Sequence, residues 1–265
     1  MKKVYRHEDN KDYWDRRWAE AGIDKDRFKN LDIYPIHFAE MVMKNRKNRV
    51  IELGAGSGRL LKHYHHEDFK IVGIERSEVA VKNLKLENPE IDIENADILN
   101  LPFEDDAFDV VLAFGLYHNL ETESDLEKAL DETARCLSNG GEFCISIRPN
   151  NLEMNLNEWY WNWKRKRKIK ADKTTRKFHK LLIGVDEFRL ILEKHGLIPE
   201  KVLKARNVSI LYRLPFLREH GRKEAQSRSE GYRLNWLGRR FDWLLTSLFP
   251  YQFCNVLVYL GHMQK

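Results

Sequence analysis

The sequence has no long apolar run and few cysteines. Nothing in its 265 residues approaches the roughly 18 consecutive apolar residues of a membrane-spanning helix, and the first residues lack the apolar stretch of a secretory signal peptide. The cysteines, Cys136, Cys144 and Cys254, show no CxxC or other metal-binding spacing. We therefore expect a cytoplasmic protein with reduced thiols and no metal site.

Internal repeats and low-complexity tracts are also absent, which argues against a repeat array or a disordered protein. The charge, however, is unevenly distributed. Residues 1–150 hold 22 Lys and Arg against 30 Asp and Glu, a net charge of −8, whereas residues 151–265 carry a net charge of +13. This asymmetry predicts that the C-terminal part faces something anionic.

Short apolar runs alternate with amphipathic segments. The pattern predicts strands near 49–53, 69–75, 91–95, 108–114, 142–147, 198–204 and 254–260, and helices near 10–21, 31–46, 59–64, 77–86, 124–137 and 185–195. Such alternation indicates an α/β fold with a doubly wound, mainly parallel sheet. We expect one domain over residues 1–265, with an N-terminal helical cap (1–47), a core (48–150) and two insertions (151–184 and 208–250) that flank the sixth strand.

The first strand runs into a glycine-rich turn, Gly54-Ala55-Gly56-Ser57-Gly58, and a helix follows. Glycines let a ligand approach the backbone closely, and the N–H groups at a helix N-terminus point into the adjoining crevice. Open α/β sheets bind ligands at this edge. The turn by itself predicts a nucleotide-like ligand, a class that includes flavin and nicotinamide cofactors.

Two further positions narrow this choice. A dinucleotide fingerprint needs a third glycine where this chain has Arg59. Glu75 ends the second strand about 20 residues downstream, where an acid accepts hydrogen bonds from both ribose hydroxyls of an adenosine. The pattern therefore favours an adenosine-containing cofactor without a pyrophosphate.

Residues 48–148 resemble the class I S-adenosylmethionine-dependent methyltransferases, with a type 11-like domain. Residues 50–58 match the first motif of that family, and Ile74-Glu75 matches its acidic second motif. Residues 96–103 match the loop that holds the adenine, and residues 108–114 match the strand beneath the methionine part. The resemblance implies a Rossmann-like, seven-stranded fold, with S-adenosyl-L-methionine as cofactor and S-adenosyl-L-homocysteine as product.

The resemblance also implies roles for individual residues. The three glycines of the turn would line the methionine and ribose, with Glu52 near the amino group. Glu75 would hold the ribose hydroxyls, and Asp97 would accept from the adenine amine beside Ile98. Aromatic residues of the N-terminal helix would close over the cofactor, although they would equally pack that helix against the sheet. The implied cofactor contacts are Tyr13, Trp14, Glu52, Gly54, Gly56, Gly58, Glu75, Asp97, Ile98, Phe114 and Gly115.

A histidine just past the fourth strand is the candidate catalytic group. Methyl transfer to a hydroxyl or amine is helped by a general base, and an unperturbed histidine, with a pKa near 6.5, suits proton removal near neutrality. We predict this role for His118, with a structural role as the alternative. Tyr117 and Asn119 are weaker candidates for positioning the acceptor.

Absent motifs exclude some acceptors. No Asn/Asp-Pro-Pro-Tyr follows the fourth strand, which argues against methylation of base exocyclic amines by that route, and no cysteine is placed for a covalent pyrimidine adduct. Residues 151–180 instead carry ten Lys and Arg, and residues 208–250 carry eight against four acids. Arginine suits phosphate or carboxylate, and Trp159 and Trp163 suit stacking on a sugar or base. We predict methyl transfer to an O or N atom of a small or carrier-linked anionic acceptor, for example a phosphorylated or nucleotide-linked sugar.

Three alternatives stay open. An RNA substrate fits the Lys/Arg run 164–168 beside aromatic residues. A lipid acceptor at a membrane surface fits residues 241–249, preceded by Arg239-Arg240, although a core helix packed on the sheet explains the same pattern. The third is a methyltransferase-like scaffold that binds the cofactor without turnover.

Overall fold

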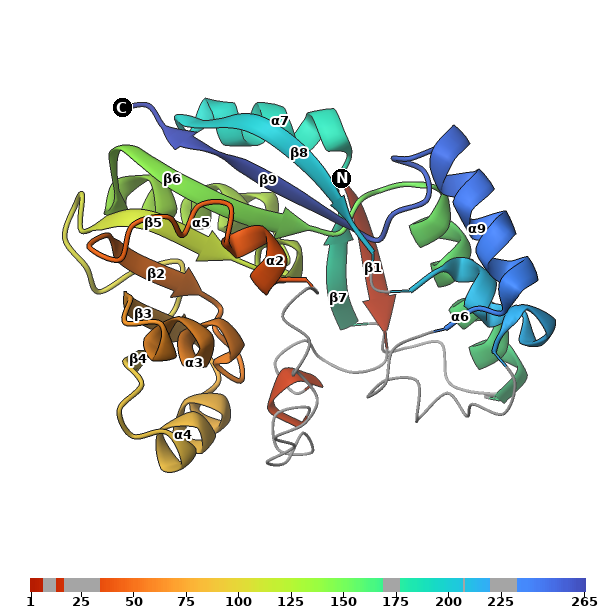
Figure 1. The fold of residues 1–265 in the computed structure, drawn as a ribbon, viewed down its shortest axis with the longest axis horizontal. Helices are drawn as coiled ribbons and strands as arrows, with labels where there is room; N and C mark the ends of the chain where they lie inside the picture. Colours follow the sequence, from red (N-terminus) through yellow and green to blue (C-terminus); the bar gives the residue numbers. More distant parts are fainter. Residues whose placement is uncertain (7–12, 17–33, 169–176, 207, 220–232) are drawn as a thin grey trace.

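The computed structural model describes residues 1–6, 13–16, 34–168, 177–206, 208–219 and 233–265 (Figure 1). Its strands are β1 (Lys2–Arg6), β2 (Arg49–Leu53), β3 (Lys70–Glu75), β4 (Ile93–Asn95), β5 (Phe108–Ala113), β6 (Leu137–Ile147), β7 (Lys177–Leu182), β8 (Leu197–Ala205) and β9 (Val256–Met263). Its labelled helices are α2 (Ile36–Ala39), α3 (Arg59–His66), α4 (Glu78–Glu87), α5 (Glu123–Cys136), α6 (Leu152–Lys168), α7 (Val185–Lys194) and α9 (Trp236–Leu248), with 3₁₀ turns η1 (Tyr117–Asn119), η2 (Ile210–Arg213) and η3 (Pro215–Leu217).

Seven of these strands form one sheet in the order β4-β3-β2-β5-β6-β9-β8. The first five run parallel to one another, and β9 runs antiparallel to both β6 and β8. The sheet is therefore mainly parallel, doubly wound and seven-stranded, which confirms the predicted fold class. All seven predicted strands are present, with boundaries that shift by a few residues.

Helices cover both faces of this sheet, which explains why its central strands are almost continuously apolar. Side chains of α5 and α7 pack on one face, together with the buried residues Phe178 and Leu181 of β7. Those of α2, α3 and α4 pack on the other. The helices begin where the sequence supplies caps: Ser77 Oγ accepts from the Ala80 N–H at α4, and the Thr122 side chain accepts from the Asp125 N–H at α5.

The strand order reverses between β2 and β5. The chain after β2 moves outward through β3 and β4, whereas β5 and β6 lie on the other side of β2. At such a switch point the loops that follow the two central strands diverge, and a crevice opens outside their carboxyl ends. The glycine turn after β2 and the Phe114–Asn119 segment after β5 both lie there.

A second, two-stranded sheet was not predicted. Strand β1 pairs antiparallel with β7, although residues 1–47 were expected to form a helical cap. Alternation in Lys2–Arg6 is too short to reveal a strand whose partner is about 175 residues away. This small sheet lies beyond the carboxyl end of β6, between the large sheet and helices α6 and α9 (Figure 1), and a parallel bridge joins Pro149 to Ile183.

Other local predictions also need correction. Within 31–46 the described helix is only α2, and of the expected helix 10–21 only residues 13–16, which are helical, are described. Asn139-Gly140-Gly141, just past the predicted helix 124–137, lies inside β6, which begins five residues before the predicted strand 142–147, and Gly140 there has a φ of 75° with no β-carbon clash. The basic segment after residue 151 forms the long helix α6.

Helix α9 is not a core helix on the large sheet. In Figure 1 it lies at the edge of the molecule with α6, away from that sheet, and Gly238 is the buried residue within it. No helix among the described residues is both long and apolar enough to cross a membrane.

Candidate cofactor and acceptor site

The glycine turn presents its backbone to the crevice. Gly54, Gly56 and Gly58 all have positive φ values, of 73°, 56° and 69°, which favour glycine. At Gly58 a β-carbon would also lie 2.4 Å from Leu84 Cδ2 of α4, so the close packing of α3 on α4 needs a glycine there. The positive φ values and the close approach to Leu84 both call for glycine, and neither depends on a bound ligand.

Glu75 holds this turn from the end of β3. Its two carboxylate oxygens accept from the Gly56 N–H (2.8 Å) and from the Ser77 N–H (2.9 Å). Burial raises the pKa of Glu75, and these backbone donors oppose the rise. The carboxylate is therefore fixed between the turn and the start of α4, at the position where the sequence predicts contacts with ribose hydroxyls.

Asp97 lies in the loop after β4. Its Oδ1 accepts from the Leu99 N–H (3.1 Å), and its Oδ2 lies 3.6 Å from Arg76 Nε. The following residue, Ile98, is buried in the core beneath this loop. Asn95 ties the loop to β3, since its amide donates to the Glu75 and Arg76 carbonyls. The predicted adenine and ribose residues thus lie along one edge, at the ends of β3 and β4.

Glu52 is a buried carboxyl group near the end of β2. Its side-chain Oε2 has no hydrogen-bond partner among the described residues. Burial raises the pKa of Glu52 to about 8, and the nearby Arg59 guanidinium and the Leu61 amide oppose the rise. Arg59, which replaces the third fingerprint glycine, also donates to the Tyr34 carbonyl (3.1 Å). A buried acid with an unused oxygen fits an ammonium ligand, such as the amino group of a methionine moiety.

The end of β5 supplies the opposite wall of the crevice. Gly115 donates its N–H to Ser146 Oγ of β6 (3.0 Å), and the same oxygen lies 2.6 Å from the Tyr34 hydroxyl. The Tyr34 ring meets the ring of Phe114 edge to face at 5.4 Å. Burial raises the pKa of Tyr34, so its hydroxyl stays protonated. Tyr34 and Ser146 therefore fix the backbone at Phe114 and Gly115.

The helical residues 13–16 connect the two sides of the site. The Tyr13 ring meets the His179 ring of β7 edge to face at 5.4 Å, and it meets Trp14 at 5.2 Å. Asp15 accepts a hydrogen bond from Ser77 Oγ (2.6 Å), directly beside Glu75. The segment thus spans from the start of α4 to β7. The closing role predicted for Tyr13 and Trp14 stays a prediction.

His118 lies in η1, which packs against β7. The side chain is buried, and its Nδ1 has no hydrogen-bond partner among the described residues. Burial lowers the pKa of His118 well below its usual value, and the charges of Arg148, Lys180 and His179 add to this effect. The imidazole is therefore neutral near pH 7, the form that can accept a proton.

The two neighbours of His118 make other contacts. The Tyr117 hydroxyl lies 2.6 Å from Thr133 Oγ1 in the core, and the Asn119 side-chain amide donates to the Gly115 carbonyl.

Buried cations surround this histidine. Arg148 follows β6 and donates to the Asn255 carbonyl (2.8 Å), and burial lowers its pKa. Lys180 of β7 lies 2.8 Å from the Glu158 carboxylate, and burial lowers the pKa of Lys180 to about 8, against the opposing effect of Glu158. Arg6 of β1 lies 4.0 Å from the same carboxylate. Among the described residues this cluster therefore sets three cations against one carboxylate.

The family comparison agrees with this geometry. Residues 51–145 match the model of a family described as a methyltransferase domain. The match covers the glycine turn, Glu75, the loop 96–103 and β5, which belong to or follow the neighbouring strands β2, β3, β4 and β5. Residues 51–145 carry a methyltransferase domain.

Curated relatives align with parts of this domain. An uncharacterized methyltransferase of Anoxybacillus flavithermus is 29% identical over 101 residues, 38% of this chain and 47% of the relative. A Mus musculus protein named probable tRNA methyltransferase 9B is 30% identical over 98 residues, 37% of this chain and 21% of that protein. The demethylmenaquinone methyltransferase of Paenarthrobacter aurescens is 33% identical over 99 residues, 37% of this chain and 38% of that enzyme. The chain therefore spans less than half the length of each of these relatives.

Solved structures share the fold along nearly the whole chain. The methyltransferase in a complex with the Haloferax volcanii Trm112 methyltransferase activator superposes with a TM-score of 0.60 at 18% identity, covering 97% of this chain and 99% of that chain. A Burkholderia thailandensis 1,6-didemethyltoxoflavin-N1-methyltransferase, solved with 1,6-didemethyltoxoflavin and S-adenosylhomocysteine, gives 0.56 at 12% identity, covering 96% and 87%. At sequence identities this low, the similarity shows a shared fold and nothing about the substrate.

Several residues of the methyltransferase domain escaped sequence reasoning. Ser146 could have been found, because it is a serine inside the apolar run 143–147, and a buried hydroxyl needs a hydrogen-bond partner. Tyr34, Arg148 and Lys180 offered no comparable signal. Arg148 directly follows β6, whereas Tyr34 precedes α2 and Lys180 lies on β7, outside the large sheet, so their positions depend on tertiary contacts.

Proposed function

We propose that this protein transfers a methyl group from S-adenosylmethionine to an anionic acceptor. The observation that carries the cofactor half of the proposal is the buried Glu52, whose unused oxygen lies beside a glycine turn. An adenosine cofactor without an amino group leaves this carboxyl unsatisfied. A methionine ammonium supplies both a charge partner and a hydrogen-bond donor.

The remaining cofactor contacts follow from the site. Glu75 would receive the ribose hydroxyls, and Asp97 with Ile98 would hold the adenine. Phe114 and Gly115 would lie beside the sulfonium, positioned through Ser146 and Tyr34. When bound, the cofactor supplies an electrophilic methyl on a positive sulfur. The protein's own contribution is to align the acceptor with that methyl and to exclude water, and we assign the second task to residues 13–16.

The anionic nature of the acceptor is inferred from the buried cations around His118. Taking Arg148 and Lys180 out of water is costly unless an opposite charge compensates them, and Glu158 is the carboxylate that pairs with Lys180. A phosphate or carboxylate on the acceptor would neutralise the positive charge that Glu158 leaves uncompensated. Since Lys180 and Glu158 belong to the insertion 151–184, we propose that this insertion binds the acceptor.

We assign His118 the role of general base, because its imidazole is neutral, buried and has a free Nδ1 among the described residues. The His118→Ala variant should slow methyl transfer by about 100-fold or more and leave the affinity for S-adenosylhomocysteine within about twofold. Radiolabelled transfer assays and calorimetry measure the two effects. Wild-type rates, or parallel loss of cofactor affinity, would leave His118 with a structural role.

The proposal is tested by transfer of labelled methyl from S-adenosylmethionine to three sets of acceptors: phosphorylated and nucleotide-linked sugars, total RNA, and lipid extracts. We expect transfer to the first set, with a Lys180→Gln variant raising the KM for the acceptor while cofactor affinity stays unchanged. Absence of S-adenosylhomocysteine binding would contradict the cofactor assignment. Binding without transfer to any set would favour a cofactor-binding scaffold.

RNA is the second candidate acceptor. It is favoured by the stacked, exposed pair Trp159 and Trp163 of α6, whose rings lie 6.4 Å apart and nearly parallel, and by the name of one relative. Transfer to RNA that depends on these tryptophans, with no transfer to sugar phosphates, would decide for this alternative.

A further inference from the structure

Helix α9 turns its apolar side outward. Trp236 and Trp243 are 69% and 64% exposed, and Leu244 and Leu248 are 44% and 62% exposed. These residues follow a helical spacing of i, i+7, i+8 and i+12, so they lie on one side of the helix. A helix that merely covers a globular protein places its apolar side inward and its polar side in water.

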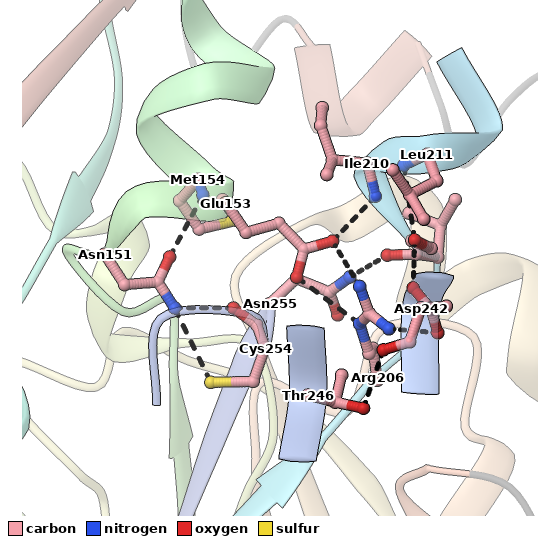
Figure 2. Close-up of polar contacts among 12 residues, drawn as sticks. Asn151, Glu153, Met154, Arg206, Ile210, Leu211, Asp242, Thr246, Cys254 and Asn255 are labelled. Carbon is pink, nitrogen blue, oxygen red and sulfur yellow. Dashed lines mark hydrogen bonds and ion pairs between the residues drawn. The ribbon is translucent and has the colours of Figure 1, made fainter. Parts of the chain in front are cut away.

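The acidic residue of α9 faces the protein instead. Asp242 pairs with Arg206, which follows β8, and accepts a hydrogen bond from Ser209 Oγ (Figure 2). The same guanidinium donates to the buried Glu153 of α6 (3.0 Å). One arginine therefore fixes the inner sides of both helices, and it adds to the packing of Leu237 of α9 against the small apolar cluster of Tyr212 and Leu217.

Helix α6 has the same inverted pattern. Its carboxylates Glu153 and Glu158 are only 2% and 4% exposed. Leu152, Leu156 and Trp159, at i, i+4 and i+7, are 46%, 39% and 64% exposed. Two neighbouring helices thus keep their acids inside and present leucine and tryptophan on their outer sides.

The outer side of α9 carries positive charge as well. Arg239 and Arg240 are exposed, and together with Trp236 and Trp243 they line a hollow of about 460 Å³. Asp242, the one acid in the sequence of α9, is neutralised by Arg206. The exposed charge of this helix is therefore cationic, beside aromatic rings.

We propose that the outer side of α9, extended by the exposed stripe of α6, docks this protein on an anionic membrane surface. Tryptophan and leucine enter the boundary between headgroups and acyl chains, and the two arginines bind lipid phosphates at the same depth. The positive charge of residues 151–265 complements such a surface. The substitutions that test this docking lie on α9, outside the insertion 151–184 that we propose binds the acceptor, so docking and methyl transfer can be tested separately.

The test is flotation of the purified full-length protein with vesicles of phosphatidylcholine, with or without one third phosphatidylglycerol. We expect binding to the anionic vesicles that weakens as salt is raised. Trp236→Ser/Trp243→Ser should lower the partition coefficient about tenfold or more, and Arg239→Gln/Arg240→Gln should lower it by about fivefold for each charge removed.

Matched controls are Leu86→Ser on α4 and Leu190→Ser on α7, which are 73% and 65% exposed on other surfaces. They should bind vesicles as the wild type does. Thermal unfolding midpoints close to wild type show that each variant is folded. Lack of binding to anionic vesicles, or wild-type binding by the tryptophan variant, would overturn the proposal. The proposal would also be overturned if the wild-type protein did not bind vesicles but formed a concentration-dependent dimer that the tryptophan variant no longer formed.

Discussion

Glu52 is the residue whose surroundings least match its charge. Glu52 lies on a central strand and one of its carboxyl oxygens has no hydrogen-bond partner among the described residues. Burying such a group costs free energy unless a ligand provides the missing partner. Arg59 lies near enough to lower its pKa, yet burial still raises the pKa to about 8. In the ligand-free protein near pH 7, Glu52 is therefore mostly protonated.

This pKa predicts the sign of proton exchange on cofactor binding. A methionine ammonium beside Glu52 favours the ionised carboxylate, so binding of S-adenosylhomocysteine at about pH 7 should release close to one proton. The release should fade as the pH rises through 8, where Glu52 is already ionised. Calorimetry in two buffers of different ionisation enthalpy measures the exchange.

The Glu52→Gln variant is the control for this effect. It keeps the shape of the side chain but cannot ionise, so it should bind more weakly and release no proton. If the wild-type protein binds without proton release, the ammonium group does not lie at Glu52.

At the scale of elements, Arg206 joins three segments that the sequence separates widely. It donates to Glu153 of α6 and to Asp242 of α9, and Glu153 also accepts from the Ile210 N–H at the start of η2 (2.8 Å) (Figure 2). Nearby, Asn255 binds the Val208 carbonyl (2.6 Å). These polar contacts therefore attach α9 to the rest of the molecule together with a small apolar cluster against which Leu237 packs.

Removal of this guanidinium should be costly. In Arg206→Met the buried carboxylate of Glu153 loses its partner, and the free energy of unfolding should fall by about 3 kcal/mol. Urea denaturation measures this loss, and limited proteolysis should cut near α9 first. The matched control is Arg46→Met, which removes an exposed pair with Glu67 and should cost less than about 1 kcal/mol. Equal effects of the two substitutions would contradict the structural role of Arg206.

At the scale of the whole molecule, the uneven charge distribution follows the two sides of the proposed site, except that Arg6 and Arg148 of the acceptor side belong to the N-terminal part. The acidic N-terminal part supplies Glu52, Glu75 and Asp97, all near the cofactor crevice. The basic C-terminal part supplies Lys180 on the acceptor side and the arginines of α9. A cationic sulfonium cofactor and an anionic acceptor would each meet the opposite charge.

Cofactor binding should therefore stabilise the whole domain. At about 100 times its dissociation constant, S-adenosylhomocysteine adds about 2.7 kcal/mol to the free energy of unfolding, which should raise the thermal unfolding midpoint on the order of 5–8 °C. The same concentration of NADPH should leave the midpoint unchanged. Differential scanning fluorimetry gives both values.

Glu75→Ala should remove most of this shift, since two charged hydrogen bonds to ribose are worth about a 100-fold change in dissociation constant. Glu78→Ala, an exposed acid in the first turn of α4, is the control and should keep the full shift. A full shift in Glu75→Ala would refute the ribose assignment.

Local patterns were enough to predict the large sheet and the cofactor crevice. The strand-turn-helix around Gly54–Gly58 is local in sequence, and Glu75 and Asp97 are each placed by the strand that ends just before them. The β1–β7 pair and the exposed sides of α6 and α9 were not predictable in this way. Their positions depend on contacts between residues more than 30 positions apart.

The sequence by itself therefore determined the fold class, the methyltransferase domain and the edge of the sheet where Gly54–Gly58, Glu75 and Asp97 lie, because hydrophobic periodicity and glycine turns act over a few residues. Only the tertiary structure decided that Glu52 keeps an unused oxygen, that His118 lies among buried cations, and that α9 faces outward. Burial and charge pairing set these properties, and both depend on which distant segments meet in space.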